Sequence, residues 1–267
     1  MLYVTDLAYP AQGRRYGDED VALSARLSRA VHVALCAPRD VLALVDRFDA
    51  VVVRNSGPML HHRREWEAFR ERALAQRTPT FNPLTGRGDM QGKQYLVDLT
   101  ARGEPVIPTV AGREGLAGLP DAPAYVVKPV LGADSIGLQV VPPDQLGGLD
   151  LDGQLVQPHV DLRYEVSFVY VGRRYCYALW APDPSRRWAL QPYSPTPDDL
   201  AFAQRFVDWN ALDHGVQRVD ACRTRDGGLL LVELEDLNPY LSLDLLDEAT
   251  RDAFVDAMTA SLLDLLR

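Results

Sequence analysis

The sequence predicts an N-terminal α/β unit with a parallel sheet, followed by a larger antiparallel α+β region. Over the first ~80 residues, strand-like apolar runs alternate with helix-like segments, a pattern typical of a parallel sheet covered by helices. Residues 78–92 are rich in Pro, Gly and Asn, as a connection between domains is. The chain beyond them contains several alternating apolar runs and a strong hairpin pattern at 216–239.

The N-terminal elements follow one another in the order strand, helix, strand, helix, strand, helix. We expect the strands at 2–5, 31–37 and 50–54, and the helices at 20–30, 39–47 and 63–75. In the first helix, Leu23, Leu27 and Ala30 share one stripe, as helical spacing requires. No G-x-G-x-x-G motif follows the first strand, which argues against a dinucleotide-binding domain.

The remaining elements predict antiparallel sheets with flanking helices. A short helix at 93–101 is stopped by Gly103. We expect the next strands at 125–128, 137–141, 154–157, 164–171 and 174–180, and further helices at 198–213 and 246–265. These elements suggest three units, with the boundaries 1–85, 86–157 and 158–267.

Composition limits the classes of partner. The chain has 267 residues, a formal net charge of −9 and a pI near 5.0, which argues against nucleic acid as a partner. It has no run of about 18 apolar residues, so we expect no membrane span. No signal peptide is evident, and three cysteines at unrelated spacings suggest neither disulfides nor a zinc site. We expect a cytoplasmic protein.

The hairpin at 216–239 carries a pattern of charged residues. If Asp226-Gly227 forms a two-residue turn, Asp220 lies opposite Glu233 and Arg218 lies opposite Glu235 on the same face. Carboxylates placed opposite each other repel, and a divalent cation such as Mg²⁺ relieves that repulsion. The alternative interpretation is a solvated strand face that is charged by chance.

A second candidate feature is a lysine at the end of a strand, followed by a loop of small residues. Lys128 ends the strand 125–128, and the loop runs from Gly132 through Ser135 to Gly137. Such a loop can hold a polyphosphate through the lysine charge and converging backbone N–H groups. The motif is not a Walker loop, and the alternative is an ordinary turn.

The order of these features resembles the ATP-grasp superfamily over nearly the whole chain, and most closely its glutathione-synthetase-like branch, which includes the cyclo-ligase that closes the cycloserine ring. The resemblance is carried by Val51–Arg54, Asn82-Pro83, Lys93–Leu96, Gly103–Thr109, Val127–Pro129, Val156–Pro158, Glu165–Ser167, Arg218–Asp220 and Leu231–Pro239. It implies an N-terminal pre-ATP-grasp, substrate-side domain at 1–85. A small lobe with the phosphate loop at 86–157 and a large lobe with the metal hairpin at 158–267 would then form a two-lobed ATP-grasp domain.

The resemblance also implies roles for individual residues, with ATP and two Mg²⁺ ions as cofactors. The nucleotide phosphates would be bound by Lys93, Lys128 and the loop that contains Gly132, Ser135 and Gly137. The adenine would meet the hinge from Gln157 to Val160, and the ribose would meet Glu165. Arg218, with Lys128, would stabilise the transferred phosphoryl group. The metal ligands would be Asp220, Glu233 and Glu235 or Asn238.

The sequence departs from the family pattern in three places. The last metal pair reads Glu233-Leu-Glu235 where many relatives have Glu-x-Asn, so either Glu235 or Asn238 could be the second ligand of that pair. The hinge begins with Gln157 where Glu is common. The cyclo-ligases carry Trp-Asp-Tyr soon after the arginine matching Arg54, whereas this chain reads Asn-Ser-Gly-Pro-Met at 55–59, which puts a shared substrate in doubt.

Substrate residues are predicted from position and charge. Arg54 follows a buried strand of the parallel sheet, where ligands bind beyond the carboxyl ends of the strands. Arg187 and Gln191 lie where relatives have an arginine-rich substrate loop, and Ser242 lies just past the metal hairpin. For each arginine the alternative is a solvated or helix-capping side chain.

Together these expectations describe an ATP- and Mg²⁺-dependent carboxylate–amine ligase that acts through an acyl phosphate on a small amino-acid-like substrate. The alternatives are a small-molecule kinase on the same fold and a nucleotide-binding regulatory protein without turnover. We expect small-molecule carboxylate and amine partners, and a homodimer is compatible with the sequence.

Overall fold

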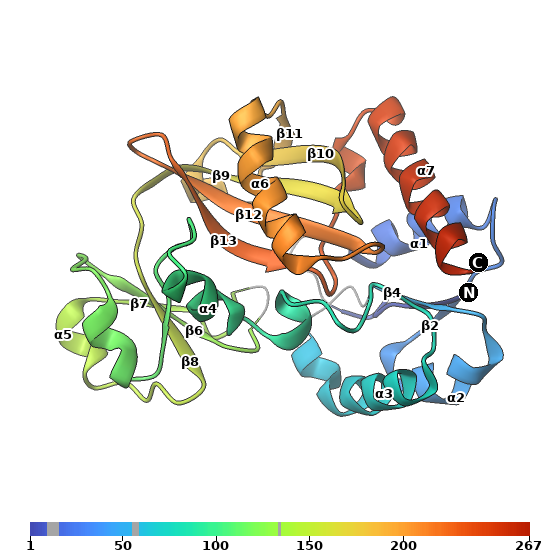
Figure 1. The fold of residues 1–267 in the computed structure, drawn as a ribbon, viewed down its shortest axis with the longest axis horizontal. Helices are drawn as coiled ribbons and strands as arrows, with labels where there is room; N and C mark the ends of the chain where they lie inside the picture. Colours follow the sequence, from blue (N-terminus) through green and yellow to red (C-terminus); the bar gives the residue numbers. More distant parts are fainter. Residues whose placement is uncertain (10–15, 55–58, 133–134) are drawn as a thin grey trace.

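The computed structural model describes residues 1–9, 16–54, 59–132 and 135–267, and the strands of these residues form three sheets (Figure 1). The N-terminal sheet has the order β2-β1-β3-β4, and all its strands run parallel. Its strands are β1 (Leu2–Val4), β2 (Ala34–Cys36), β3 (Val51–Val53) and β4 (Thr80–Phe81). The predicted parallel sheet is therefore confirmed, and the segment expected to be a plain connection supplies a fourth strand.

Three helices accompany this sheet, namely α1 (Tyr16–Leu27), α2 (Val41–Leu44) and α3 (Arg63–Gln76). The helix expected at 39–47 is α-helical only over its middle residues, with 3₁₀ turns at Pro38–Asp40 and Val45–Arg47. Proline is tolerated at the first helical position because its missing N–H would have no partner there, and 3₁₀ turns are frequent at helix ends. The first helix covers Tyr16–Leu27 instead of 20–30, which places Glu19 inside it and leaves Ala30 beyond its end.

The second sheet is antiparallel and has the order β5-β8-β6-β7. Its strands are β5 (Val110–Ala111), β6 (Tyr125–Pro129), β7 (Gln139–Val141) and β8 (Gln154–Pro158), with helices α4 (Tyr95–Ala101) and α5 (Pro143–Leu146) nearby. The sequence did not predict β5, because two residues are too few to show alternation. The strand β6 ends beside Lys128, as expected.

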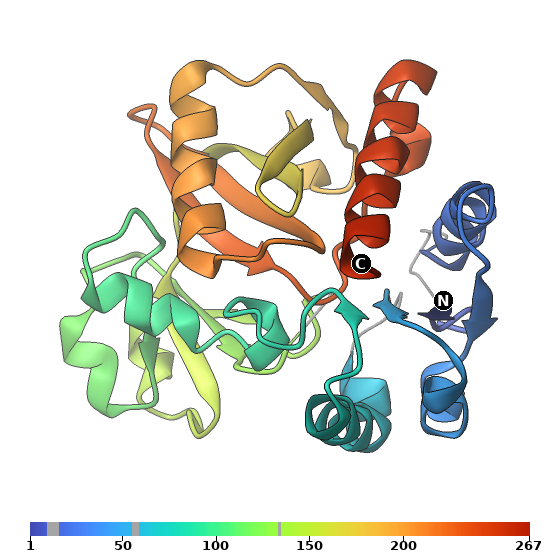
Figure 2. The same cartoon turned by 45° about the vertical axis from the view of Figure 1, so that its right-hand side comes forward.

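The third sheet is also antiparallel, with the order β11-β10-β9-β12-β13. Its strands are β9 (Leu162–Val171), β10 (Arg174–Ala181), β11 (Gln191–Tyr193), β12 (Val216–Thr224) and β13 (Leu229–Glu235). Along β9, alternate side chains enter different cores: Phe168 and Tyr170 pack with α6 (Pro197–Asn210), whereas Val169 and Val171 pack with α7 (Glu248–Leu265). The two helices thus cover opposite faces of this sheet (Figure 2).

The core beneath α7 is shared with the N-terminal sheet. Tyr3, Val52 and Phe81 belong to the same hydrophobic cluster as Val216 and Phe254. The N-terminal unit therefore packs against the third sheet, which brings the ends of β3 and β13 together. The proposed boundaries after residues 85 and 157 remain predictions.

The hairpin β12–β13 has the predicted register at its acidic end. Asp220 pairs with Glu233 and Arg218 pairs with Glu235. The turn differs from the expected two-residue type, because Thr224 N–H donates to Gly228 O across a loop of three residues, with Gly227 at φ +96°. A register shift follows Asp220, whose next neighbour Ala221 pairs with Leu231. The bulged Val232 compensates for the longer turn, so the acidic residues still face one another.

Among the described residues, no helix combines the length and apolarity needed to cross a bilayer. The three cysteines are free.

Candidate active site

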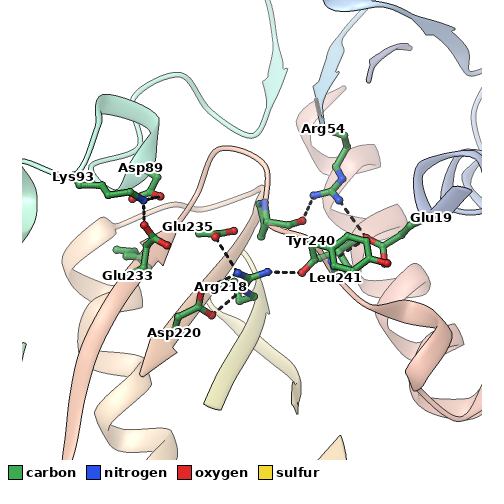
Figure 3. A network of polar contacts seen from close by, with 12 residues as sticks. Glu19, Arg54, Asp89, Lys93, Arg218, Asp220, Glu233, Glu235, Tyr240 and Leu241 are labelled. Carbon is green, nitrogen blue, oxygen red and sulfur yellow. Dashed lines mark hydrogen bonds and ion pairs between the residues drawn. The ribbon is translucent and has the colours of Figure 1, made fainter. Parts of the chain in front are cut away.

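Three carboxylates converge at the end of the hairpin. Asp89, Glu233 and Glu235 each offer an oxygen, and these oxygens lie within 4.8 Å of one another. Glu233 and Glu235 come from β13, and Asp89 begins a 3₁₀ turn at Asp89–Gln91 (Figure 3). Oxygen ligands at this spacing suit a hard divalent cation. Asp89 was not among the predicted ligands.

A buried carboxylate holds Asp89 in this cluster. Asp236, which is fully buried, accepts hydrogen bonds from the backbone N–H groups of Gly88 (2.9 Å) and Met90 (2.7 Å). A Cβ atom at Gly86 would lie 2.3 Å from Asp236 Oδ2, and one at Gly88 would lie 2.4 Å from Leu234 O. The two glycines therefore allow the turn to approach β13. The pattern Gly-x-Gly-Asp before Lys93 was the available signal in the sequence.

Asp220 lies opposite Glu233, as predicted, and its side chain contacts Arg218. Both of its oxygens accept hydrogen bonds from Arg218, from Nε and Nη2, at 2.8 Å each. The group of three converging carboxylates contains Asp89 and not Asp220, and the metal role of Asp220 stays a prediction. In this structure both of its oxygens are bound by the arginine fork.

Arg218 links this hairpin to the segment that follows it. Its Nη2 lies 2.9 Å from Glu235 Oε1, and its Nη1 donates to Tyr240 O at 2.6 Å (Figure 3). Burial raises the pKa of Glu235 to about 7, against the opposing effect of Arg218. A carboxylate that is costly to ionise in isolation is stabilised by a nearby cation.

The two predicted lysines have different partners. Lys93 is buried and pairs with Asp89 at 2.6 Å and with Glu233. The side chain of Lys128 makes no ion pair or hydrogen bond with any described residue, and burial, followed by the charge of Lys93, lowers its pKa to about 7. An ammonium group without a protein partner beside a second lysine is suited to an anion such as a polyphosphate.

The predicted phosphate loop follows β6. Ser135 and Gly137 have φ values of +58° and +76°, and residues 133 and 134 lie outside the described part of the chain. Gly132 borders a cavity of about 540 Å³ together with Asp89, Lys93 and Asn238. The loop, one lysine and one carboxylate of the cluster therefore line a common space, and Asn238 borders it without belonging to the carboxylate cluster.

Of the residues predicted to bind the nucleotide or to form the substrate loop, Glu165 and Arg187 contact each other. Gln157 is buried and donates its amide to Thr109 Oγ1 at 2.8 Å, while Val160 lies in the connection between β8 and β9. Glu165 pairs with Arg187 at 2.9 Å, which joins a predicted ribose ligand to a predicted substrate residue. Gln191 lies exposed at the start of β11.

Ser242 lies in the segment that follows β13, and Arg54 contacts the same segment. Ser242 is buried, adopts a left-handed φ of +53°, and borders a second cavity of about 510 Å³ with Glu19, Trp188 and Tyr240. Arg54 was expected to face an open cleft, but its side chain is buried. It donates to Asp20 Oδ1 at 3.2 Å and to Pro239 O at 2.6 Å.

Comparison with known proteins identifies the family. No family model matches the chain. A curated relative, the cycloserine biosynthesis protein DcsG of Streptomyces lavendulae, is 30% identical over 239 residues, covering 74% of this chain and 78% of that protein.

Solved structures share the fold over nearly the whole chain. The D-cycloserine synthetase DcsG superposes with a TM-score of 0.75 at 24% identity, covering 98% of this chain and 99% of that one. An ATP complex of D-alanine–D-alanine ligase from Bacillus anthracis gives 0.64 at 14% identity, covering 99% and 95%. The macrocyclase MdnC from Microcystis aeruginosa, bound to its precursor peptide, gives 0.65 at 11% identity, covering 99% of each chain.

The chain carries the acidic hairpin with two lysines beside it, and its curated relative is 30% identical over 74% of the chain. The chain therefore belongs to the ATP-grasp ligases, ATP-dependent enzymes that form C–N bonds.

Proposed function

We propose that this protein joins a carboxylate to an amine through an acyl phosphate and acts on a small amino-acid-like substrate. The observation that carries the proposal is the placement of the carboxylates of Asp89, Glu233 and Glu235 beside Lys93, with Arg218 on the neighbouring strand. This set can bind a cation and an anionic phosphate chain in one place.

The donor set suits Mg²⁺, because all three converging groups are carboxylates and none is a thiol or imidazole. Asp89, Glu233 and Glu235 would hold it, with Asn238 nearby, and we propose two ions. When bound, Mg²⁺ neutralises charge on the β- and γ-phosphate oxygens of ATP.

The side chains of the protein supply the remaining charge and the geometry. Lys93 would exchange its carboxylate partners for phosphate oxygens, and Lys128 would bring its unpaired ammonium to the same phosphates. Arg218, held by Asp220 and Tyr240 O, would stabilise the phosphoryl group in transfer. Glu165 would bind the ribose, and the hinge from Gln157 to Val160 would meet the adenine through its backbone.

The reaction then proceeds in two displacements. A carboxylate oxygen of the substrate attacks the γ-phosphorus and ADP leaves, forming an acyl phosphate. The amine attacks the acyl carbon, loses a proton and displaces inorganic phosphate. Ser242, Arg187 and Gln191 would contact substrate, and Arg54 would support the segment that carries Ser242 through its hydrogen bond to Pro239 O.

The name of the relative DcsG refers to cycloserine biosynthesis, and this suggests an intramolecular ligation as one form of the reaction. The residues at 55–58, where the cyclo-ligase pattern differs, lie outside the described part of the chain. The number of protomers also remains a prediction.

The decisive experiment measures ADP and phosphate release over a panel of amino acids and small carboxylates, with and without hydroxylamine. A ligase releases free phosphate, and hydroxylamine converts its acyl phosphate into a hydroxamate. Glu233→Ala should abolish turnover in the same assay. A stable phosphorylated product without free phosphate would instead identify a kinase and overturn the proposal.

A further inference from the structure

The cavity of about 540 Å³ extends beyond the metal cluster as far as α3. Its inner end is formed by Asp89, Lys93 and Asn238, and its outer wall by Trp66, Arg70 and Leu74 of α3. This volume is within the usual range for a small-molecule site. The predicted substrate residues do not border it, and the functions assigned above use only its inner end.

Arg70 is the unusual residue of this wall. Its Nε atom is buried and has no hydrogen-bond partner, and its guanidinium forms no ion pair with any residue in the described ranges. The other cations that line the cavity are neutralised, since Arg63 pairs with Glu67 at 2.8 Å and Lys93 pairs with Asp89 at 2.6 Å. Arg70 as a whole is only partly buried and lines the cavity, so its guanidinium, which has no anion among the described residues to pair with, is open to an anionic ligand there.

The chemistry of the wall defines the group that would fit. A guanidinium matches a carboxylate through two parallel hydrogen bonds. Trp66, Leu74, Met90 and Leu237 line the same cavity and give it an apolar wall. Glu71, an exposed residue next to Arg70 in the sequence, also lines the cavity and makes no ion pair with the described residues. It offers an acceptor for an ammonium group.

We infer that this α3 cavity binds the amino-acid end of the substrate, with Arg70 holding a carboxylate that does not react. The reacting end would then extend toward Asp89 and Lys93, where the γ-phosphate lies in the proposed function. The inference rests on that function and specifies its substrate class: an acid that carries a second, free carboxylate beside an amine.

The test uses the intact protein loaded with Mg²⁺ and ADP, and measures binding by calorimetry. The probes are the D and L forms of aspartate and glutamate, which carry a second carboxylate, each compared with its α-amide. We expect at least one acid to bind at least tenfold more tightly than its amide. Arg70→Met should remove that preference, and Arg70→Lys should restore part of it, because lysine keeps the charge but loses the fork.

Arg64→Met is the matched control, since Arg64 is exposed on the same helix and does not line the cavity. It should bind the acids as the unmodified protein does. The inference is overturned if no acid is preferred over its amide, if Arg70→Met keeps the preference, or if Arg70→Met weakens ADP instead. The binding measurements do not require turnover. If the ligase assay showed no ADP release, the proposed function would be contradicted, but the measured preference for an acid over its amide would still stand.

Discussion

Two arginine clusters of the same composition hold the segment 239–243 from opposite sides. Arg54 pairs with Glu19 and Asp20, and Arg218 pairs with Asp220 and Glu235. Arg54 donates to Pro239 O, and Arg218 donates to the next carbonyl, Tyr240 O (Figure 3). Each cluster therefore combines one positive charge with two carboxylates and binds one backbone oxygen.

Their surroundings differ. The side chains of Arg54, Glu19 and Asp20 are 4%, 5% and 0% exposed, whereas those of Arg218, Asp220 and Glu235 are 15%, 17% and 22% exposed. In the closed cluster, Glu19 also accepts from the N–H groups of Leu241 (2.9 Å) and Leu243 (3.0 Å). The protein thus satisfies the closed cluster by itself, and leaves the open cluster with excess negative charge beside Asp89 and Glu233. We therefore expect the first cluster to contribute stability, and we propose that the second contributes to catalysis.

The largest expected effect is on catalysis at the open cluster. Arg218→Met should lower kcat by about 10²–10³-fold, because a preorganised donor to the transferring group is lost. The urea midpoint should change little, since removing Arg218 from a partly exposed site leaves its carboxylates accessible to water. Steady-state kinetics and urea unfolding on the same sample measure both quantities. A large loss of stability with retained kcat would reverse the assignment.

At the closed cluster we expect the opposite result. Arg54→Met should lower the free energy of unfolding by about 3–5 kcal/mol, because Glu19 and Asp20 remain buried without their cation. The KM for ATP should stay nearly unchanged at a temperature where the variant is folded. Arg54→Lys serves as the charge-retaining control. If the variant instead raised the KM of the acid without destabilising the fold, Arg54 would be the substrate clamp that the sequence predicted.

The closed cluster should also be visible in the pH dependence of stability. Burial raises the pKa of Glu19 from its ordinary value of 4.5 to about 7 in the folded protein. The folded state therefore holds this proton more tightly, and the associated stability is lost as pH rises from about 4.5 to about 7. The loss is on the order of 3 kcal/mol. Glu19→Gln should flatten the decline measured by urea unfolding across this window, and an unchanged slope would contradict the shift.

The smallest expected effect distinguishes the carboxylates of the open cluster. Asp89→Asn should raise the Mg²⁺ concentration for half-maximal activity by roughly tenfold, equivalent to about 1.4 kcal/mol. Asp220→Asn should raise it less, because Arg218 already occupies both oxygens of Asp220. Titrating Mg²⁺ at saturating ATP measures the difference. A stronger effect of Asp220→Asn would restore its predicted role as the ligand.

The register of the β12–β13 hairpin depends both on the local sequence pattern and on tertiary packing. The alternation of residues 216–235 correctly predicted that Asp220 lies opposite Glu233. The predicted turn was wrong by one residue, and a bulge at Val232 restores the register. Val219 and Leu234 are buried on the other face of the hairpin. They hold the register at Asp220, because a one-residue slip would turn these side chains toward solvent.

The sequence by itself determined the order of the longer strands and helices, the acidic face of the hairpin and the lysine at the end of β6, because these depend on periodicity and short spacing. It missed the short strands β4, β5 and β11. It could not place Asp89 beside Glu233, or Arg54 against Pro239, since both contacts join segments more than a hundred residues apart. The tertiary structure decided these pairings through two buried carboxylates. Asp236 accepts a hydrogen bond from Met90 N–H in the turn at Asp89, and Glu19 accepts one from Leu241 N–H. Buried carboxylates must find N–H donors or cations, and only the folded chain brings those donors within reach.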